Sequence, residues 1–190
     1  MKKCRSYGLG CILIFVCSIS LFAQHKDKTR NDSGNFSISD FPKKWVGKWK
    51  GTLHWYQGVV EREPVAMELH ISPLDSADHY SWRMIYGSQQ SDVRPYILKP
   101  FNKEKGHWLI DEKNSIVLDH FLVGDRFSSS FTVQGNTLIN NTWLSGDSLI
   151  VEFYNMQEKP IAISGGGDST IPKVKSYGIR TFQRAVLYRH

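Results

Sequence analysis

Residues 41–51 read Phe-Pro-Lys-Lys-Trp-Val-Gly-Lys-Trp-Lys-Gly, and this stretch leads into the first strong strand pattern of the chain. Over residues 48–56, apolar or small side chains alternate with polar ones, which predicts a strand with one apolar and one solvated face. Residues 24–40 are mostly polar and cannot bury enough apolar surface to order themselves. We therefore expect a tether over residues 24–40 and a folded domain over residues 41–190.

The remainder of the chain predicts an all-β fold. Short alternating runs are separated by turn residues, and no window shows an amphipathic helical period over several turns. Gly135-Asn136 and Gly146-Asp147 suit the tight turns of β-hairpins, because these turn positions need positive φ. The expected strands cover residues 48–56, 65–71, 79–86, 94–101, 107–111, 116–123, 126–133, 137–144, 149–155 and 177–189.

These strands are expected to form a single up-and-down antiparallel β-barrel of about 8–10 strands. An open sheet of that length would accumulate twist and expose bare edges, and closure removes both problems. A two-sheet sandwich stays open, but consecutive hairpins favour the barrel. Pro95 and Pro100 mark residues 94–101 as an edge strand or a bent strand. A loop that carries Gly165, Gly166 and Gly167 is expected to lead into the last strand.

Residues 1–23 have the pattern of a secretory signal peptide. Lys2, Lys3 and Arg5 form a basic start, a mostly apolar run covers residues 9–22, and Ala23 is a small residue suited to cleavage. The apolar run is too short for a comfortable membrane span, so no stable span is expected after cleavage. A lipid anchor is disfavoured, because Cys17 does not follow a small residue. We expect a secreted or periplasmic protein.

Composition excludes several classes of function. All three cysteines lie within residues 1–23, so the expected mature chain has no disulfide, thiolate metal site or thiol nucleophile. Removing the three basic residues of the signal lowers the formal charge from +6 to +3. Basic and acidic residues are interspersed, which disfavours a nucleic-acid partner. The histidines lack metal-ligand spacing, so neither a metal nor a cofactor is expected, although a single axial haem ligand stays open.

The opening stretch resembles the first signature of the lipocalins and their calycin relatives, in which an aromatic residue precedes Gly-x-Trp at the entry of the first strand. Trp45, Gly47 and Trp49 match this signature. The resemblance implies that Trp49 plugs the closed end of the barrel and that an arginine of the last strand packs across it. Arg180, Arg184 and Arg189 are the available arginines. We choose Arg184, because it shares a strand face with apolar neighbours.

The lipocalin-like pattern, which is also similar to uncharacterised secreted bacterial proteins, implies a small apolar or aromatic ligand inside the barrel. The family's second signature, a Thr-Asp-Tyr-like loop, is not found. Aromatic residues make up 13% of the chain, and many lie on apolar strand faces. Arg94 and Tyr96 flank Pro95 and are candidate polar contacts. The expected ligand-binding residues are Trp55, Tyr80, Trp82, Tyr86, Arg94, Tyr96, Phe127 and Phe131.

Two other functions stay open. The aromatic side chains can instead fill the barrel, and the protein would then act through its surface as an envelope interaction module. A hydrolase or isomerase that used Asp111, Glu112 or His120 would need these side chains to converge in one pocket. Asp119 cannot easily orient His120, because neighbours along a strand point to opposite faces. We therefore favour a non-enzymatic binding protein.

Overall fold

The computed structural model describes residues 40–88 and 92–190, so the expected signal peptide and residues 24–39 of the expected tether lie outside the described residues. Two short 3-10 helices, η2 (Lys43–Trp45) and η4 (Lys103–Lys105), accompany the strands. The strands are β1 (Gly47–Gln57), β2 (Val60–Glu61), β3 (Val65–Pro73), β4 (Tyr80–Tyr86), β5 (Asp92–Asn102), β6 (His107–Asp111), β7 (Val117–Val123), β8 (Arg126–Val133), β9 (Asn136–Ser145), β10 (Ser148–Ser164) and β11 (Val174–Arg189).

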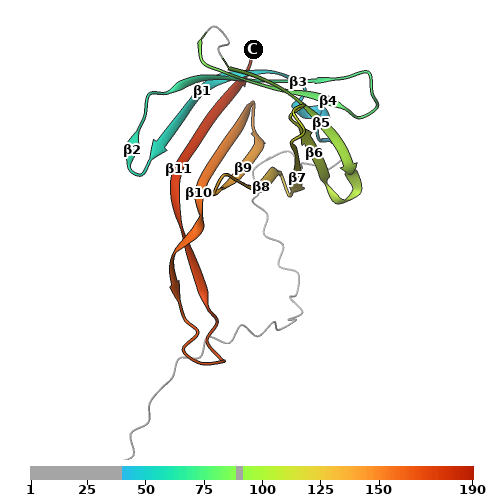
Figure 1. Ribbon diagram of the computed structural model, residues 1–190. Helices are drawn as coiled ribbons and strands as arrows, with labels where there is room; N and C mark the ends of the chain where they lie inside the picture. The colour runs from blue at the N-terminus through green and yellow to red at the C-terminus, as the bar shows by residue number, and fades with distance from the viewer. Residues whose placement is uncertain (1–39, 89–91) are drawn as a thin grey trace, which may run out of the picture. The chain divides into compact units, whose positions relative to one another are not determined.

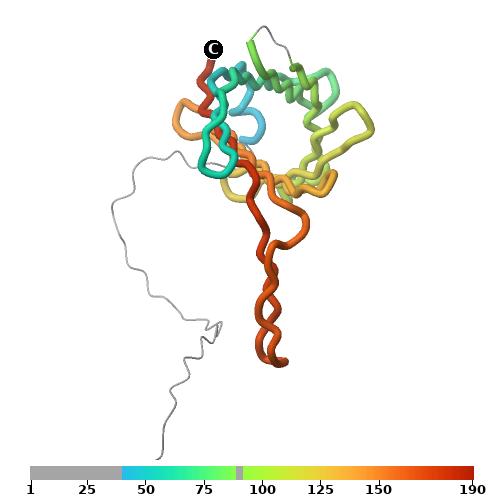
Figure 2. The backbone as a smooth tube through the Cα atoms, turned by 60° about the vertical axis from the view of Figure 1, so that its left-hand side comes forward, coloured from blue at the N-terminus to red at the C-terminus, as the bar shows by residue number. Residues whose placement is uncertain are grey.

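The strands form one closed antiparallel barrel (Figure 1). Strands β1 and β3–β11 pair in sequence order, and β11 pairs back onto β1 from Trp49↔Arg189 to Gln57↔Thr181. Figure 2 shows the resulting ring. The two-residue strand β2 only pairs with the far end of β1. The predicted all-β up-and-down barrel is confirmed. In the part of the chain that the structure describes, no helix is long and apolar enough to cross a membrane.

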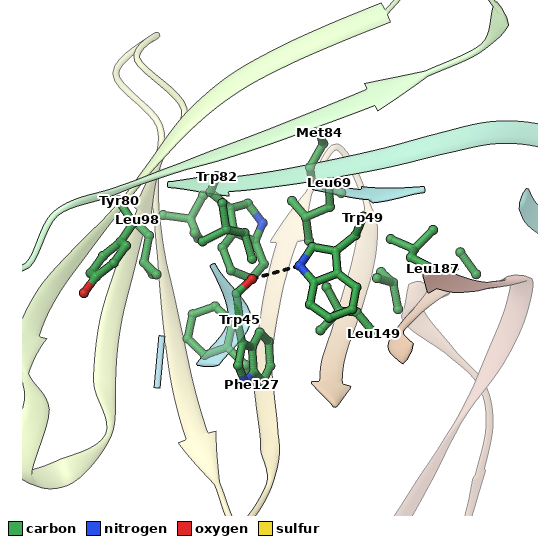
Figure 3. Close-up of a cluster of buried hydrophobic side chains, with 14 of the residues drawn as sticks. Trp45, Trp49, Leu69, Tyr80, Trp82, Met84, Leu98, Phe127, Leu149 and Leu187 are labelled. Carbon is green, nitrogen blue, oxygen red and sulfur yellow. Dashed lines mark hydrogen bonds between the residues drawn. The ribbon is translucent and has the colours of Figure 1, made fainter. Parts of the chain in front are cut away.

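One end of the barrel is filled by tightly packed side chains (Figure 3). Trp45 is fully buried, and the indole Nε1 of Trp49 donates a hydrogen bond of 2.8 Å to the carbonyl of Trp45. Phe41 packs edge-on against Trp45 and Trp108, with ring centroids 4.9 and 5.2 Å apart. Because these large rings meet where β1 begins, they close this end of the barrel.

Arg189 covers the tryptophan plug. Its guanidinium lies 4.2 Å from the ring centroid of Trp49 and donates hydrogen bonds to the carbonyls of Val46 and Lys44 at 2.6 and 2.8 Å. A Cβ at Gly47 would lie 2.6 Å from Nη1 of Arg189, and Gly47 has a φ of 148°. The glycine of the Gly-x-Trp pattern therefore leaves room for the arginine that covers the tryptophan.

The expectation that Arg184 would take this position is wrong. Arg184 pairs with His54 across β1, on the outer face, and its Nε lies 3.6 Å from Oε1 of Glu152. The inward face of β11 instead carries Ala185 and Leu187, both fully buried. Phe182 and Tyr188 share the outer face with Arg184. Because aromatic side chains also occur on this outer face, the apolar pattern of β11 indicated the wrong face as the inner one.

Strand β5 corrects a second expectation. It pairs with β4 on one side and β6 on the other, so it is not an edge strand. The register shifts between Pro100 and Asn102, where β5 meets β6. A proline cannot donate to a neighbouring strand, and a local irregularity accommodates it inside the sheet. The alternative of a bent strand agrees with this arrangement.

Strands β10 and β11 are longer than predicted. Pairing of β10 with β9 ends at Gln157, and pairing of β11 with β1 ends at Thr181. Beyond these positions the two strands pair only with each other, as far as Ser164↔Val174. This two-stranded ribbon extends beyond the rim of the barrel (Figure 1). The expected loop around Gly165 is thus only the tip of a long hairpin.

Candidate functional site

A cavity of about 470 Å³ occupies the barrel interior beyond the tryptophan plug. On β1, Trp49 belongs to the plug, whereas Leu53 and Trp55 line the cavity. On β11, Leu187 packs in the plug region, whereas Gln183 lines the cavity. The interior is therefore filled at one end and hollow toward the other.

Trp82 and Phe127 form the floor of the cavity. Their ring centroids lie 5.5 Å apart, and both side chains also pack against the plug, where Trp45 lies 6.3 Å from each ring. Trp82 is on β4 and Phe127 on β8, so strands from opposite parts of the ring meet at this level. The floor thus contacts both the packed core and the cavity.

An aromatic wall rises above this floor. Tyr86 at the end of β4 and Tyr96 on β5 contribute phenol rings, and the indole Nε1 of Trp55 donates a hydrogen bond of 3.0 Å to the carbonyl of Glu63. Burial raises the pKa of Tyr86 and of Tyr96, so both phenols stay protonated at neutral pH. The Trp, Tyr and Phe residues that line the cavity are Trp55, Trp82, Tyr86, Tyr96, Phe127, Phe131, Phe153 and Tyr154, of which Tyr154 also packs against Phe182.

Arg94 lies at the cavity with its charge already compensated. Its Nε and Nη2 donate hydrogen bonds to the two carboxylate oxygens of Asp92 at 3.2 and 2.8 Å. Its guanidinium also lies 4.8 Å from the ring centroid of Tyr86. The hydrogen bond with Asp92 raises the pKa of Arg94 further above its ordinary value. Arg94 is therefore a permanent cation that an acidic neighbour already pairs.

His120 is a neutral imidazole inside the barrel. Its ring stacks on Phe127 with centroids 4.8 Å apart, and Nδ1 lies 3.3 Å from the carbonyl oxygen of Leu118, to which it donates. Burial lowers the pKa of His120 to about 4. At neutral pH the ring carries no charge, so it presents an uncharged aromatic surface to the cavity.

The candidate catalytic residues do not converge as a group. Glu112 and His120 both line the cavity, whereas Asp111 bonds to Lys99, and this hydrogen bond lowers the pKa of Asp111. Asp119 instead accepts a hydrogen bond of 2.7 Å from His107 Nε2, on the other face of β7 from His120. Within residues 40–88 and 92–190, no group of three or more His, Cys, Asp and Glu side chains is arranged to hold a metal ion.

The structure brings together most of the residues predicted for ligand binding. Trp55, Trp82, Tyr86, Arg94, Tyr96, Phe127 and Phe131 line the cavity. Tyr80 does not share this position: it is a buried core residue opposite Leu98 and Pro73. Tyr80 lies at the start of β4, toward the plug, whereas Tyr86 at the end of the same strand reaches the cavity.

The sequence analysis missed a polar wall on the opposite side. Strands β9, β10 and β11 contribute uncharged polar side chains here, namely Asn140, Thr142, Asn155, Thr181 and Gln183. Their signal in the sequence is weak, because a polar residue at every second strand position is also typical of a solvated face. Only the closed register shows that this face points inward.

No protein-family model matches the chain, and no curated protein sequence does so either. Among solved structures, the S-type phycobiliprotein lyase CPES from Guillardia theta is similar, with a TM-score of 0.54 and 13% identity over 83% of this chain and 94% of that chain. A protein of unknown function from the DUF3598 family of Nostoc punctiforme has a TM-score of 0.54 and 14% identity, over 82% of this chain and 49% of that chain. This chain thus spans about half the length of the second protein. The likeness concerns the fold alone, a closed antiparallel β-barrel.

Proposed function

We propose that this protein binds a small, mostly apolar or aromatic molecule inside its barrel. The observation that carries the proposal is the cavity of about 470 Å³, which has an aromatic floor and wall above a filled plug. A volume of this size is within the range of small-molecule sites in proteins. The structural likeness to a phycobiliprotein lyase supports the proposal at the level of the fold.

The test uses pyrene, an uncharged aromatic probe whose vibronic fluorescence bands report the polarity around it. Wild-type protein should bind pyrene with stoichiometry one and move its emission toward the apolar pattern. Leu138→Trp should weaken binding at least about tenfold, because the larger side chain enters the cavity that Leu138 lines. Ile139→Trp is the matched control, because the next residue of β9 points away from the cavity.

Equal loss of pyrene binding in both variants would place the probe outside the cavity and reject the proposal. Native mass spectrometry of protein purified from its own host gives an independent measure. A retained small molecule in wild-type protein, reduced in Leu138→Trp and kept in Ile139→Trp, is the expected result.

We also propose that the protein is exported, on the basis of the signal-peptide pattern in residues 1–23. N-terminal sequencing of the protein recovered from the periplasm or the medium should begin at or near Gln24. Recovery of the chain only in the cytoplasm with Met1 intact would reject this proposal.

A further inference from the structure

Two asparagine side chains in the polar wall present their N–H groups to the cavity. They belong to Asn140 on β9 and Asn155 on β10, and both residues line the cavity. In each amide the oxygen Oδ1 is buried, whereas Nδ2 is accessible and has no hydrogen-bond partner among the described residues. A carboxamide nitrogen carries two N–H donors and accepts no hydrogen bond. A ligand in the cavity therefore meets donors at both positions.

The two amides belong to one patch on the inner face of the barrel. Asn140 lies directly opposite Phe153 in the pairing of β9 with β10, and Asn155 follows Phe153 by two positions. Residues two apart on a strand share a face, so the two asparagines are diagonal neighbours, with Cα atoms about 7–8 Å apart. We call this pair the amide patch. Its two Nδ2 groups serve the same region of the cavity.

The buried ends of the two amides decide which atoms a ligand meets. A half-turn of either amide would bury an NH₂ group, with two N–H donors, in the place of one oxygen. Among main-chain groups, buried N–H donors without a partner are rarer than under-bonded carbonyl oxygens, and the cost of burying an unpaired polar group applies to side-chain amides as well. The arrangement with Nδ2 toward the cavity is therefore the more stable one.

The charges around the cavity favour an uncharged acceptor. Among the described residues that line it, Arg94 is the one permanent cation, and Asp92 already bonds to its Nε and Nη2. Glu112 also lines the cavity and carries a carboxyl group. An anionic ligand would compete with Asp92 and meet Glu112, so a neutral carbonyl is the acceptor that fits this cavity.

We propose that the amide patch selects uncharged, flat aromatic ligands that carry a carbonyl group on one edge. A carbonyl oxygen accepts hydrogen bonds near the plane of its substituents, so the ligand turns its edge to the amide patch and its ring faces to the aromatic wall. Nδ2 of Asn140 or Asn155 donates to the carbonyl. This inference rests on the proposed ligand-binding function and specifies its ligand class. A molecule of equal shape without an acceptor displaces water from the two amides and leaves their N–H groups unpaired.

Three tricyclic compounds of nearly identical shape test this proposal. Fluorenone carries a carbonyl group on its central ring, fluorene has a CH₂ group in its place, and carbazole has an N–H donor there. Binding of each compound to the full protein is measured by equilibrium dialysis. Wild-type protein should bind fluorenone about five- to tenfold more tightly than fluorene, which is the effect of one hydrogen bond to an otherwise unpaired donor. Carbazole should bind no more tightly than fluorene.

The double variant Asn140→Leu/Asn155→Leu should bind fluorenone and fluorene equally, because leucine keeps the approximate volume and removes both donors. Asn141→Leu is the matched control and should keep the preference. Asn141 is next to Asn140 on β9, and its Oδ1 accepts a hydrogen bond of 2.8 Å from Ser128.

The carbonyl stretching frequency of bound fluorenone gives a second measure that needs no variant. A hydrogen bond from an amide lowers this frequency, so infrared difference spectra of the wild-type complex should show the band below its position in hexane. A band at the hexane position would mean that the carbonyl accepts no hydrogen bond, and would overturn the inference.

The outcomes separate the two proposals. If pyrene binds but fluorenone and fluorene bind equally in wild type, the carbonyl selection is wrong and the binding function stands. Tighter binding of carbazole than of fluorenone would show that the amide patch presents acceptors, and a preference for fluorenone that the double variant keeps would place the donor elsewhere. Either result overturns the inference. If neither pyrene nor any tricyclic compound binds, the proposed function fails and this inference fails with it.

Discussion

The buried imidazole of His120 makes a quantitative prediction about stability in acid. The ordinary pKa of a histidine is about 6.5, and burial lowers that of His120 to about 4 in the folded protein. As the pH falls below about 6.5, the unfolded chain takes up a proton that the folded protein refuses until about pH 4. The free energy of unfolding therefore falls with decreasing pH across this window.

The size of the effect follows from the two pKa values. The difference between the two pKa values corresponds to about 3 kcal/mol in total, of which about 2 kcal/mol is lost between pH 7 and pH 5. The variant His120→Phe has no titrating group here and keeps a ring that can stack on Phe127. Its free energy of unfolding should therefore fall about 2 kcal/mol less than that of wild type over the same interval.

Urea unfolding followed by tryptophan fluorescence at pH 7 and pH 5 measures this difference. Val123→Ala is the control, because it changes an exposed side chain of the same strand, β7, and no titrating group. That variant should keep the wild-type pH dependence to within about 0.5 kcal/mol. Parallel pH profiles for wild type and His120→Phe would refute the assignment of His120 as a buried neutral group.

Three further predictions concern the plug and the cavity rim. Arg189→Ala should lower the free energy of unfolding by about 1–2 kcal/mol, because the contact with Trp49 and two hydrogen bonds are lost. Arg184→Ala, the control, should lower it by about 0.5 kcal/mol or less. Equal urea midpoints for the two variants would contradict this prediction. Gly51→Ala should cost more than about 2 kcal/mol in thermal or urea unfolding, because its Cβ would lie 2.2 Å from a backbone oxygen of β11, and an unchanged midpoint would reject this packing. Asp92→Asn removes the negative charge that pairs with Arg94. Binding of the anionic dye 1-anilinonaphthalene-8-sulfonate should therefore tighten about threefold or more. Unchanged affinity would show that Arg94 is not accessible from the cavity.

Strand positions were largely predictable, because the alternation of apolar and polar side chains is a local property. Residues 48–56 and 65–71 fall within β1 and β3. The hairpin turns were equally readable, since Gly135 and Gly146 both have positive φ. The far ends of β10 and β11 were missed, because these strands continue where neither β9 nor β1 flanks them and their pattern is irregular.

The choice of inward face was harder to predict. On β11, apolar residues occur on both faces: Phe182 packs on Tyr154 outside, with ring centroids 4.8 Å apart, while Leu187 is buried inside. When a strand has apolar residues on both faces, its sequence does not indicate which face the closed barrel will bury. The wrong choice of Arg184 over Arg189 has this origin.

The sequence by itself determined the fold class, because strand alternation and hairpin turns are short-range patterns, and the resemblance of Trp45, Gly47 and Trp49 to a family signature implied the tryptophan plug. Only the tertiary structure decided which side chains line the cavity. Asn140 and Asn155 lie on different strands, and they meet because β9 and β10 pair in a register that closure of the whole ring sets. Which side chains share an interior depends on contacts between strands distant in the chain, and a local pattern carries no information about those contacts.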